Sequence, residues 1–102
     1  MAFLYVTEFV TTGRDSAAGV PVGHGGSWRE NPASPISIGG SNAESTAFGP
    51  NTSLIRVHTD AICSILVGVS PAATTGNARM AANQTEYFAV QGGQQISVIS
   101  NT

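Results

Sequence analysis

Few residues of this chain carry chemistry, and His58 and Asp60 are the pair whose spacing comes closest to a catalytic arrangement. Residues two apart on an extended strand project from the same face. His58, Asp60 and one of the serines therefore have the residue types of a hydrolytic triad. The sequence has no Gly-x-Ser-x-Gly turn that would expose a serine nucleophile. We therefore predict a polar pair at a strand end, with Asp60 bonding the backbone amides of a turn, and no enzyme activity.

The string Gly23-His24-Gly25-Gly26 is the second local candidate, because glycine-rich turns beside a histidine can build an oxyanion hole or a phosphate nest. Phosphate-binding loops also need a following lysine and helix, or a strand-to-helix context, and the sequence around this string has neither. We interpret the string as a turn or arm segment in which glycine permits a positive φ.

A metal site would have to recruit His24, His58 and Cys63, whose spacings match none of the short ligand motifs of zinc sites. Cys63 is the only cysteine, and we expect it to be a small buried core residue. No two of the six acidic residues stand out as a glycosidase pair. The sequence predicts neither a metal nor a cofactor.

Charge is scarce in this chain. Charged residues make up 10%, against about 25% in an average globular protein, and lysine is absent. A surface of hydroxyls, amides and glycine backbone can be buried against another protein without desolvating many ions, which favours a subunit of an assembly. A secreted or environmental β-protein with a neutral surface remains the alternative. The net charge of −2 is not the positive charge that nucleic-acid binding favours. No apolar run of the sequence is long enough to cross a membrane.

Short β-branched and aromatic runs separated by Gly, Pro and Asn predict an all-β fold, and helix signals are poor. Gly92-Gly93 joins the last two runs and is typical of a β-hairpin. The number and spacing of the runs predict a small antiparallel β-sandwich or a jelly-roll-like barrel with an extended N-terminal arm. The expected strands are Phe3–Thr11, Pro35–Ile38, Leu54–His58, Ile62–Val69, Glu86–Gln91 and Gln95–Ser100.

We expect one domain, with residues 35–102 as the β-sandwich core and residues 1–34 as a strand plus a Gly/Pro/Ser-rich arm. Both faces of the first run are largely apolar, which indicates either a strand covered on both sides or an arm lying on a partner. The segment from Thr12 to Pro35 is too long for a structureless loop in a compact domain. It holds short edge strands around Val20–Val22, or it becomes ordered on a neighbouring subunit.

The second half, from Asn51 to Ser100, carries an ordered strand pattern with a loop signature. The pattern consists of Leu54-Ile55-Arg56-Val57, Asp60-Ala61, Ile65-Leu66-Val67-Gly68, Ser70-Pro71-Ala72-Ala73-Thr74, Met80, Glu86-Tyr87-Phe88-Ala89-Val90 and Gln95-Ile96-Ser97-Val98-Ile99. This order resembles small β-sandwich proteins encoded among the virion structural genes of tailed bacteriophages, and no motif of the first half matches.

The resemblance implies a capsid decoration (cement) protein that stabilises a bacteriophage capsid by packing between neighbouring capsid subunits. Its expected partners are the major capsid protein or other virion subunits, and its expected state is a homo-oligomer, with a trimer favoured. Its expected location is the capsid surface, after assembly in the host cytoplasm. We expect the loop Ser70–Asn83 to be a second contact surface and residues 1–34 to be removable without unfolding the core. The expected interface residues are Phe3, Tyr5, Phe9, Trp28 and Met80.

A carbohydrate-binding or adhesive β-module of a phage tail or fibre is the alternative function. Aromatic rings stack on the faces of sugar rings, and this alternative predicts an exposed aromatic platform. Its candidate residues are Tyr5, Trp28, Phe48 and Tyr87.

Overall fold

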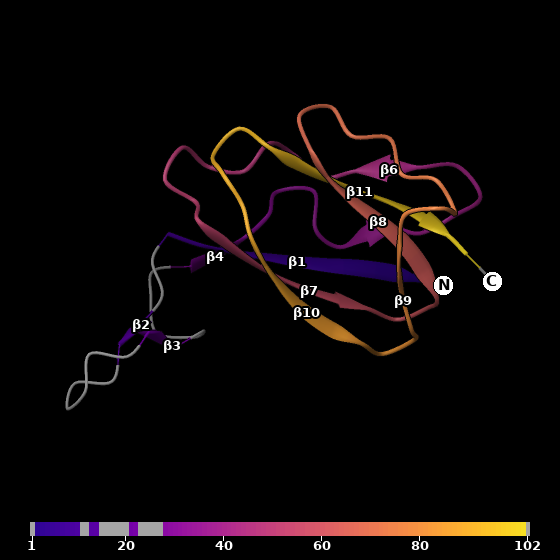
Figure 1. Ribbon diagram of the computed structural model, residues 1–102, viewed down its shortest axis with the longest axis horizontal. Coiled ribbons are helices and arrows are strands. Elements are labelled where there is room, and N and C mark those ends of the chain that lie inside the picture. The colour runs from indigo at the N-terminus through magenta and orange to yellow at the C-terminus, as the bar shows by residue number, and fades with distance from the viewer. Residues whose placement is uncertain (1, 11–12, 15–20, 23–27, 102) are drawn as a thin grey trace.

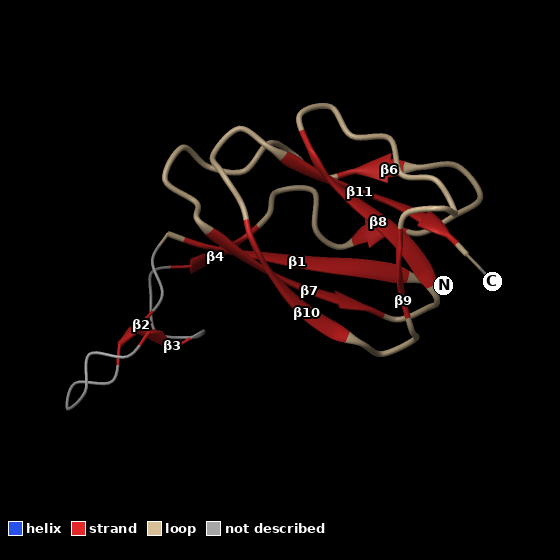
Figure 2. Cartoon of the chain, viewed as in Figure 1, coloured by secondary structure: helices blue, strands red, loops and turns tan. Residues whose placement is uncertain are grey.

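Strands are the only regular secondary structure in the part of the chain that the computed structural model describes, namely residues 2–10, 13–14, 21–22 and 28–101 (Figure 2). Two antiparallel sheets pack face to face, and a separate two-stranded pair lies beside them (Figure 1). Among these residues no helix is present that would cross a membrane. The predicted all-β sandwich is confirmed.

The larger sheet has the strand order β10-β7-β1-β4, and β5 also pairs with β1. The smaller sheet has the order β6-β11-β8-β9. The strands of the larger sheet are β1 (Phe3–Phe9), β4 (Trp28–Glu30), β5 (Ile36–Ser37), β7 (Leu54–Thr59) and β10 (Thr85–Ala89). Those of the smaller sheet are β6 (Ala43–Glu44), β8 (Cys63–Gly68), β9 (Ala78–Met80) and β11 (Gln95–Ser100).

The hydrophobic core lies between the two sheets, because alternate side chains of each strand point inward. Full burial of an aliphatic side chain contributes about 1.5–3 kcal/mol, so this cluster is the main source of stability. Cys63 belongs to it, which confirms the expected burial of that residue. The buried apolar residues are Leu4, Val6, Ile36, Phe48, Ile55, Val57, Cys63, Ile65, Met80, Val90, Ile96 and Val98.

Strand β1 is the centre of the larger sheet and does not form an arm. It pairs with β7 along one side and with β4 and β5 along the other. Its inward residues Leu4 and Val6 are fully buried. The prediction that residues 1–34 can be removed from a folded core is therefore wrong, because the deletion would take away the middle strand of a sheet.

The predicted hairpin across Gly92-Gly93 is also wrong. Strand β10 pairs with β7 in the larger sheet and β11 pairs with β8 in the smaller one, so the chain crosses between layers here. A Cβ atom on Gly92 would lie 2.6 Å from the carbonyl oxygen of Pro50 and 2.7 Å from that of Gly49. Gly93 has a φ of 87°. The two glycines thus permit a close backbone approach and a left-handed turn within a crossover.

The segment Ser70–Asn83, predicted as a second contact surface, packs in part on its own domain. Ala73 is buried, and its amide donates to Ser97 Oγ on the outward side of β11 at 3.0 Å. The segment then forms β9, which pairs with β8 and buries Met80 in the core. Met80 therefore fills a site within this chain and is not exposed as expected of an interface residue.

The segment between β1 and β4 contains the two-stranded pair of β2 (Gly13–Arg14) and β3 (Pro21–Val22). These strands pair with each other in antiparallel register and belong to neither main sheet (Figure 1). Of the two alternatives for this segment, a short strand around Val20–Val22 is present at Pro21–Val22, but it is not an edge strand of either main sheet. Val20 lies outside the described residues.

Candidate binding groove

The outward face of the larger sheet is the candidate functional surface. Register places its side chains in rows that cross β4, β1, β7 and β10, because paired residues share a face. One row is mainly apolar, the next is mainly polar, and the third includes a histidine. The rows are Trp28-Phe9-Leu54-Ala89, Glu30-Thr7-Arg56-Tyr87 and Tyr5-His58-Thr85.

Most aromatic side chains of the chain gather on this face. Tyr5, Trp28 and Tyr87 are all exposed, and the indole of Trp28 is the most open, at 62%. The ring of Phe3 lies 6.4 Å from that of Tyr5, centroid to centroid. Phe48 is instead buried in the core. The structure thus places three of the four aromatic residues considered for a sugar-binding platform on one sheet face, on three different strands.

The predicted interface residues do not form a single surface. Phe9 and Met80 are buried, and Phe3 is partly buried. Only Tyr5 and Trp28 of that set are exposed. Trp28 is therefore the most exposed of the expected interface residues.

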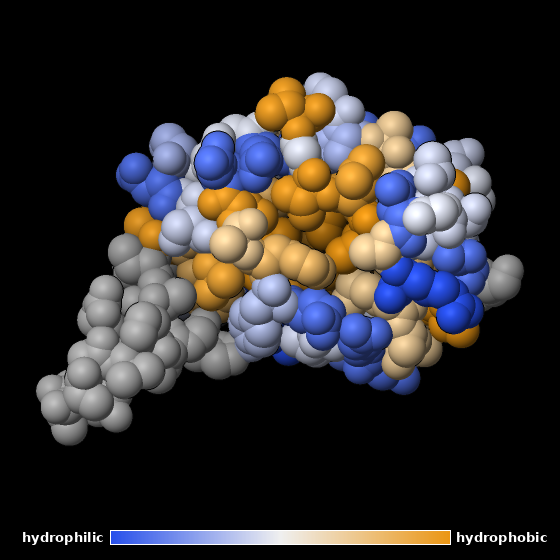
Figure 3. All heavy atoms as spheres, in the orientation of Figure 1, coloured by the Kyte–Doolittle hydropathy of each residue, from blue (hydrophilic) through white to orange (hydrophobic). Residues whose placement is uncertain are grey.

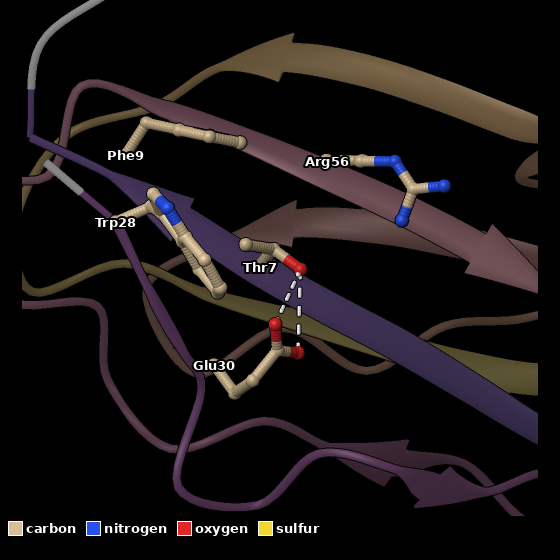
Figure 4. A pocket seen from close by; sticks show the side chains of 5 residues that line it. All are labelled: Thr7, Phe9, Trp28, Glu30 and Arg56. Atoms are coloured by element: carbon tan, nitrogen blue, oxygen red, sulfur yellow. Dashed lines mark hydrogen bonds between the residues drawn. The ribbon is translucent and has the colours of Figure 1, made fainter. Parts of the chain in front are cut away.

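A shallow groove lies beside Trp28, with a volume of about 380 Å³ (Figure 4). Thr7 and Phe9 come from β1, Trp28 and Glu30 from β4, and Arg56 from β7. Thr7 Oγ1 donates to the Glu30 carboxylate, at 3.1 Å and 3.3 Å from its two oxygens. In the part of the chain that the structure describes, the Arg56 guanidinium has no hydrogen-bond or ion-pair partner. The groove therefore presents one acceptor group, one donor group and an indole.

Glu8 lies on the opposite face of the same strands and holds β4 in place. Its carboxylate is 1% exposed. Oε1 accepts from the Gly49 amide at 2.9 Å and from Thr52 Oγ1 at 2.8 Å. Oε2 accepts from Asn31 Nδ2 at 2.8 Å, and Arg29 Nη2 lies 3.2 Å from both oxygens. Both carboxylate oxygens of Glu8 therefore accept hydrogen bonds from the protein. A buried charge requires such partners.

The electrostatics of Glu8 follow from this geometry. Burial alone would raise the pKa of the Glu8 carboxyl, but the hydrogen bonds from Gly49, Thr52 and Asn31, with the charge of Arg29, outweigh it and lower the pKa. Glu8 is therefore an anion that anchors structure. The sequence carried one signal for it, a carboxylate in the otherwise apolar inward row of the first strand.

Asn31 extends this anchor to the next loop. Its Oδ1 accepts from the amides of Ala33 and Thr46, and its Nδ2 donates to the Thr46 carbonyl as well as to Glu8. Trp28 and Glu30 flank Arg29 in sequence and project to the groove side. The Glu8 network thus fixes the backbone that carries two of the groove's side chains.

His58 and Asp60 are predicted as a polar pair at a strand end, and His58 contacts a residue of the neighbouring strand. His58 Nδ1 lies 2.8 Å from Thr85 Oγ1, its neighbour on β10. The turn after β7 is bonded by Thr59, whose Oγ1 accepts from the Ala61 amide at 3.2 Å and donates to the Ala61 carbonyl at 2.6 Å. The turn role expected of Asp60 therefore falls to Thr59.

The remaining candidates give no reactive centre among the residues described. Burial raises the pKa of the Cys63 thiol, and a hydrogen bond to Thr59 offsets this only in part. His24 and the string Gly23-His24-Gly25-Gly26 lie outside the described residues. Within those residues no three His, Cys, Asp or Glu side chains group as metal ligands. No protein-family model, no curated protein and no solved structure matches this chain.

Proposed function

We propose that this chain is a structural protein of a bacteriophage virion, of the capsid decoration type, which packs between neighbouring capsid subunits and carries out no catalysis. The resemblance of Asn51–Ser100 to small β-sandwich virion proteins supports this proposal. The low charge supports it as well, because few ions must be desolvated when such a surface is buried. The major capsid protein is the proposed partner, and a homotrimer is the proposed oligomer.

The β2–β3 pair is the single observation that carries the proposal. Phe9 and Trp28 are register partners, so the chain leaves the sandwich and returns at adjacent points. Between them β2 and β3 pair only with each other (Figure 1). An isolated two-stranded pair is marginally stable in water at best, and long excursions from a compact domain are usually functional. A neighbouring subunit would offer a surface on which this two-stranded pair could pack.

The open side of the sandwich supports the same role. Figure 3 shows apolar side chains gathered over the space between the two sheets on the face in view. Phe88 of β10 and Val67 of β8 are partly buried hydrophobics that pack against the core. Val69, just after β8, is 80% exposed. Burial of apolar surface of this kind under another subunit is favourable.

The test is to replace residues 11–27 with a Gly-Ser-Gly-Ser linker and to measure co-sedimentation with cognate capsids that lack the chain. We expect the variant to unfold cooperatively, as judged by circular dichroism, because both main sheets are intact. We expect it to lose capsid binding. The matched control inserts the same linker between Gly39 and Gly40, which are exposed and have open space around them.

Two outcomes would count against the proposal. Failure of the wild-type chain to sediment with capsids would reject the decoration role itself. Full binding by the variant that lacks residues 11–27 would move the contact from the β2–β3 segment to the sandwich. Sedimentation equilibrium of the wild-type chain tests the trimer separately.

A further inference from the structure

We propose that the groove beside Trp28 binds one ring of a neutral saccharide. This site goes beyond the proposed role in the virion and does not depend on it. The β2–β3 segment would make the contact with the capsid, and the groove would hold a glycan. The argument rests on the side chains in Figure 4 and on the balance of their charges.

The apolar half of the groove suits the carbon-bearing face of a sugar ring. The Trp28 indole forms one wall, and the residue is 62% exposed. Phe9, its register partner on β1, supplies an apolar side chain at the base of the same wall. Large exposed aromatic rings lose little conformational entropy on binding, which makes such a residue an energetic anchor.

The polar half of the groove pairs one anion with one cation. Glu30 only accepts hydrogen bonds and Arg56 only donates them. They stand on strands β4 and β7, which flank β1. Strands two apart in a sheet are separated by roughly 9.5 Å, so a single sugar ring fits between the two groups. Its hydroxyls both donate and accept, and so satisfy both groups.

Charge complementarity decides against the other occupants. A carboxylate or phosphate ligand would be attracted by Arg56 but repelled by Glu30. A cationic ligand would be attracted by Glu30 but repelled by Arg56. A neutral polyol meets no repulsion. The volume of about 380 Å³ lies at the small end of the range for ligand pockets, which fits one ring and not a folded peptide.

Two contacts hold the Glu30 side of the groove before any ligand arrives. Thr7 Oγ1 orients the Glu30 carboxylate, and the Glu8–Arg29 contact on the other face fixes β4 between Trp28 and Glu30. Preorganisation of this kind reduces the entropy cost of binding.

Trp28 gives the test a built-in reporter, since it is the only tryptophan in the chain. We would titrate the full-length chain with cellotetraose, maltotetraose and tetra-N-acetylchitotetraose, and follow Trp28 fluorescence and the heat of binding. We expect a saturable change in emission with at least one of these neutral sugars. We also expect affinity that is insensitive to added salt, because no net charge is neutralised.

Matched variants place the sugar in the groove. We expect R56Q and E30Q each to weaken binding at least about tenfold, because each removes a charge-assisted hydrogen bond. The controls are R79Q on β9 and E44Q on β6, which change the same charges at exposed positions of the other sheet. Gln at position 30 keeps an oxygen that accepts from Thr7, and cooperative unfolding of each variant confirms that it folds.

The proposal is overturned if none of the three sugars changes Trp28 emission or releases heat. Equal losses in R56Q and R79Q would also overturn it, because the effect would then be general to charge. Binding of heparin or an acidic peptide, with a steep salt dependence and no response to neutral sugars, would assign the groove to an anion. R56Q should weaken sugar binding and leave capsid sedimentation unchanged, because Arg56 lies on β7 and is not one of the expected interface residues. This separates the proposal from the decoration role.

Discussion

Arg29 Nη2 lies 3.2 Å from each carboxylate oxygen of Glu8, yet the two side chains differ sharply in burial, at 50% and 1% exposed. They are register partners on β4 and β1. The carboxylate depends on the protein for all of its hydrogen bonds, whereas the guanidinium is half in solvent. The two residues of one ion pair should therefore have unequal effects on stability.

Replacement of Glu8 by Gln should lower the free energy of unfolding by about 3 kcal/mol, because a buried network loses its charge and a Gln amide group turns one donor toward other donors. Replacement of Arg29 by Gln should cost about 1 kcal/mol or less, since three uncharged donors remain and the lost pair is solvent-screened. Urea denaturation of both variants measures the difference. Equal losses would mean that the ion pair, and not the buried carboxylate, organises this region.

The same carboxylate predicts a dependence on pH. The pKa of Glu8 is lowered in the folded chain, so its contribution to stability is complete above the unfolded value of about 4.3. That contribution is lost as the pH falls through the lowered folded pKa. The stability gap between wild type and E8Q should therefore shrink on acidification. Thermal midpoints measured from pH 7 to pH 3 test this, with E44Q as an exposed control, and a gap that stays constant would contradict the prediction.

The strands could be predicted from the sequence, but their partners could not. The runs at Leu54–His58 and Gln95–Ser100 alternate in a way that only a half-buried strand explains, and both are strands. Gly92-Gly93 fits a tight hairpin and a crossover equally well by local chemistry. The choice depends on the close approach of the Pro50 backbone, a contact between segments far apart in sequence.

The groove was only partly predictable for a similar reason. Trp28 stood out as a large aromatic residue in a stretch of small ones. Arg56 and Glu30 carried no local signal, because the register of β1 with both β4 and β7 is what brings them beside it. Glu8 was misleading in a different way, since a charge in an apolar row looks like an exposed position until its donors from distant loops are known.

The crossover glycine gives a direct test of this topology. Replacement of Gly92 by Ala should destabilise the domain by about 2 kcal/mol or more. The new Cβ would lie 2.6 Å from the carbonyl oxygen of Pro50, so one of the two backbone segments would have to shift. Gly40 is the control, since nothing lies within 4 Å of a Cβ there and its replacement by Ala should change stability by about 0.5 kcal/mol at most. Chemical denaturation compares the two. A neutral G92A would indicate that the 49–50 and 92 backbones do not meet.

Met80 and Val69 separate core packing from surface contact. Met80 is 2% exposed and packs in the core, whereas Val69 is 80% exposed. Met80→Ala should lower the free energy of unfolding by about 3 kcal/mol through lost apolar contacts and the cavity left behind. Val69→Ala should change it by about 0.5 kcal/mol at most. Urea denaturation measures both values, and capsid sedimentation below the unfolding midpoint measures contact. If M80A kept wild-type stability but lost capsid binding, Met80 would be an interface residue, and the core position of β9 would be wrong.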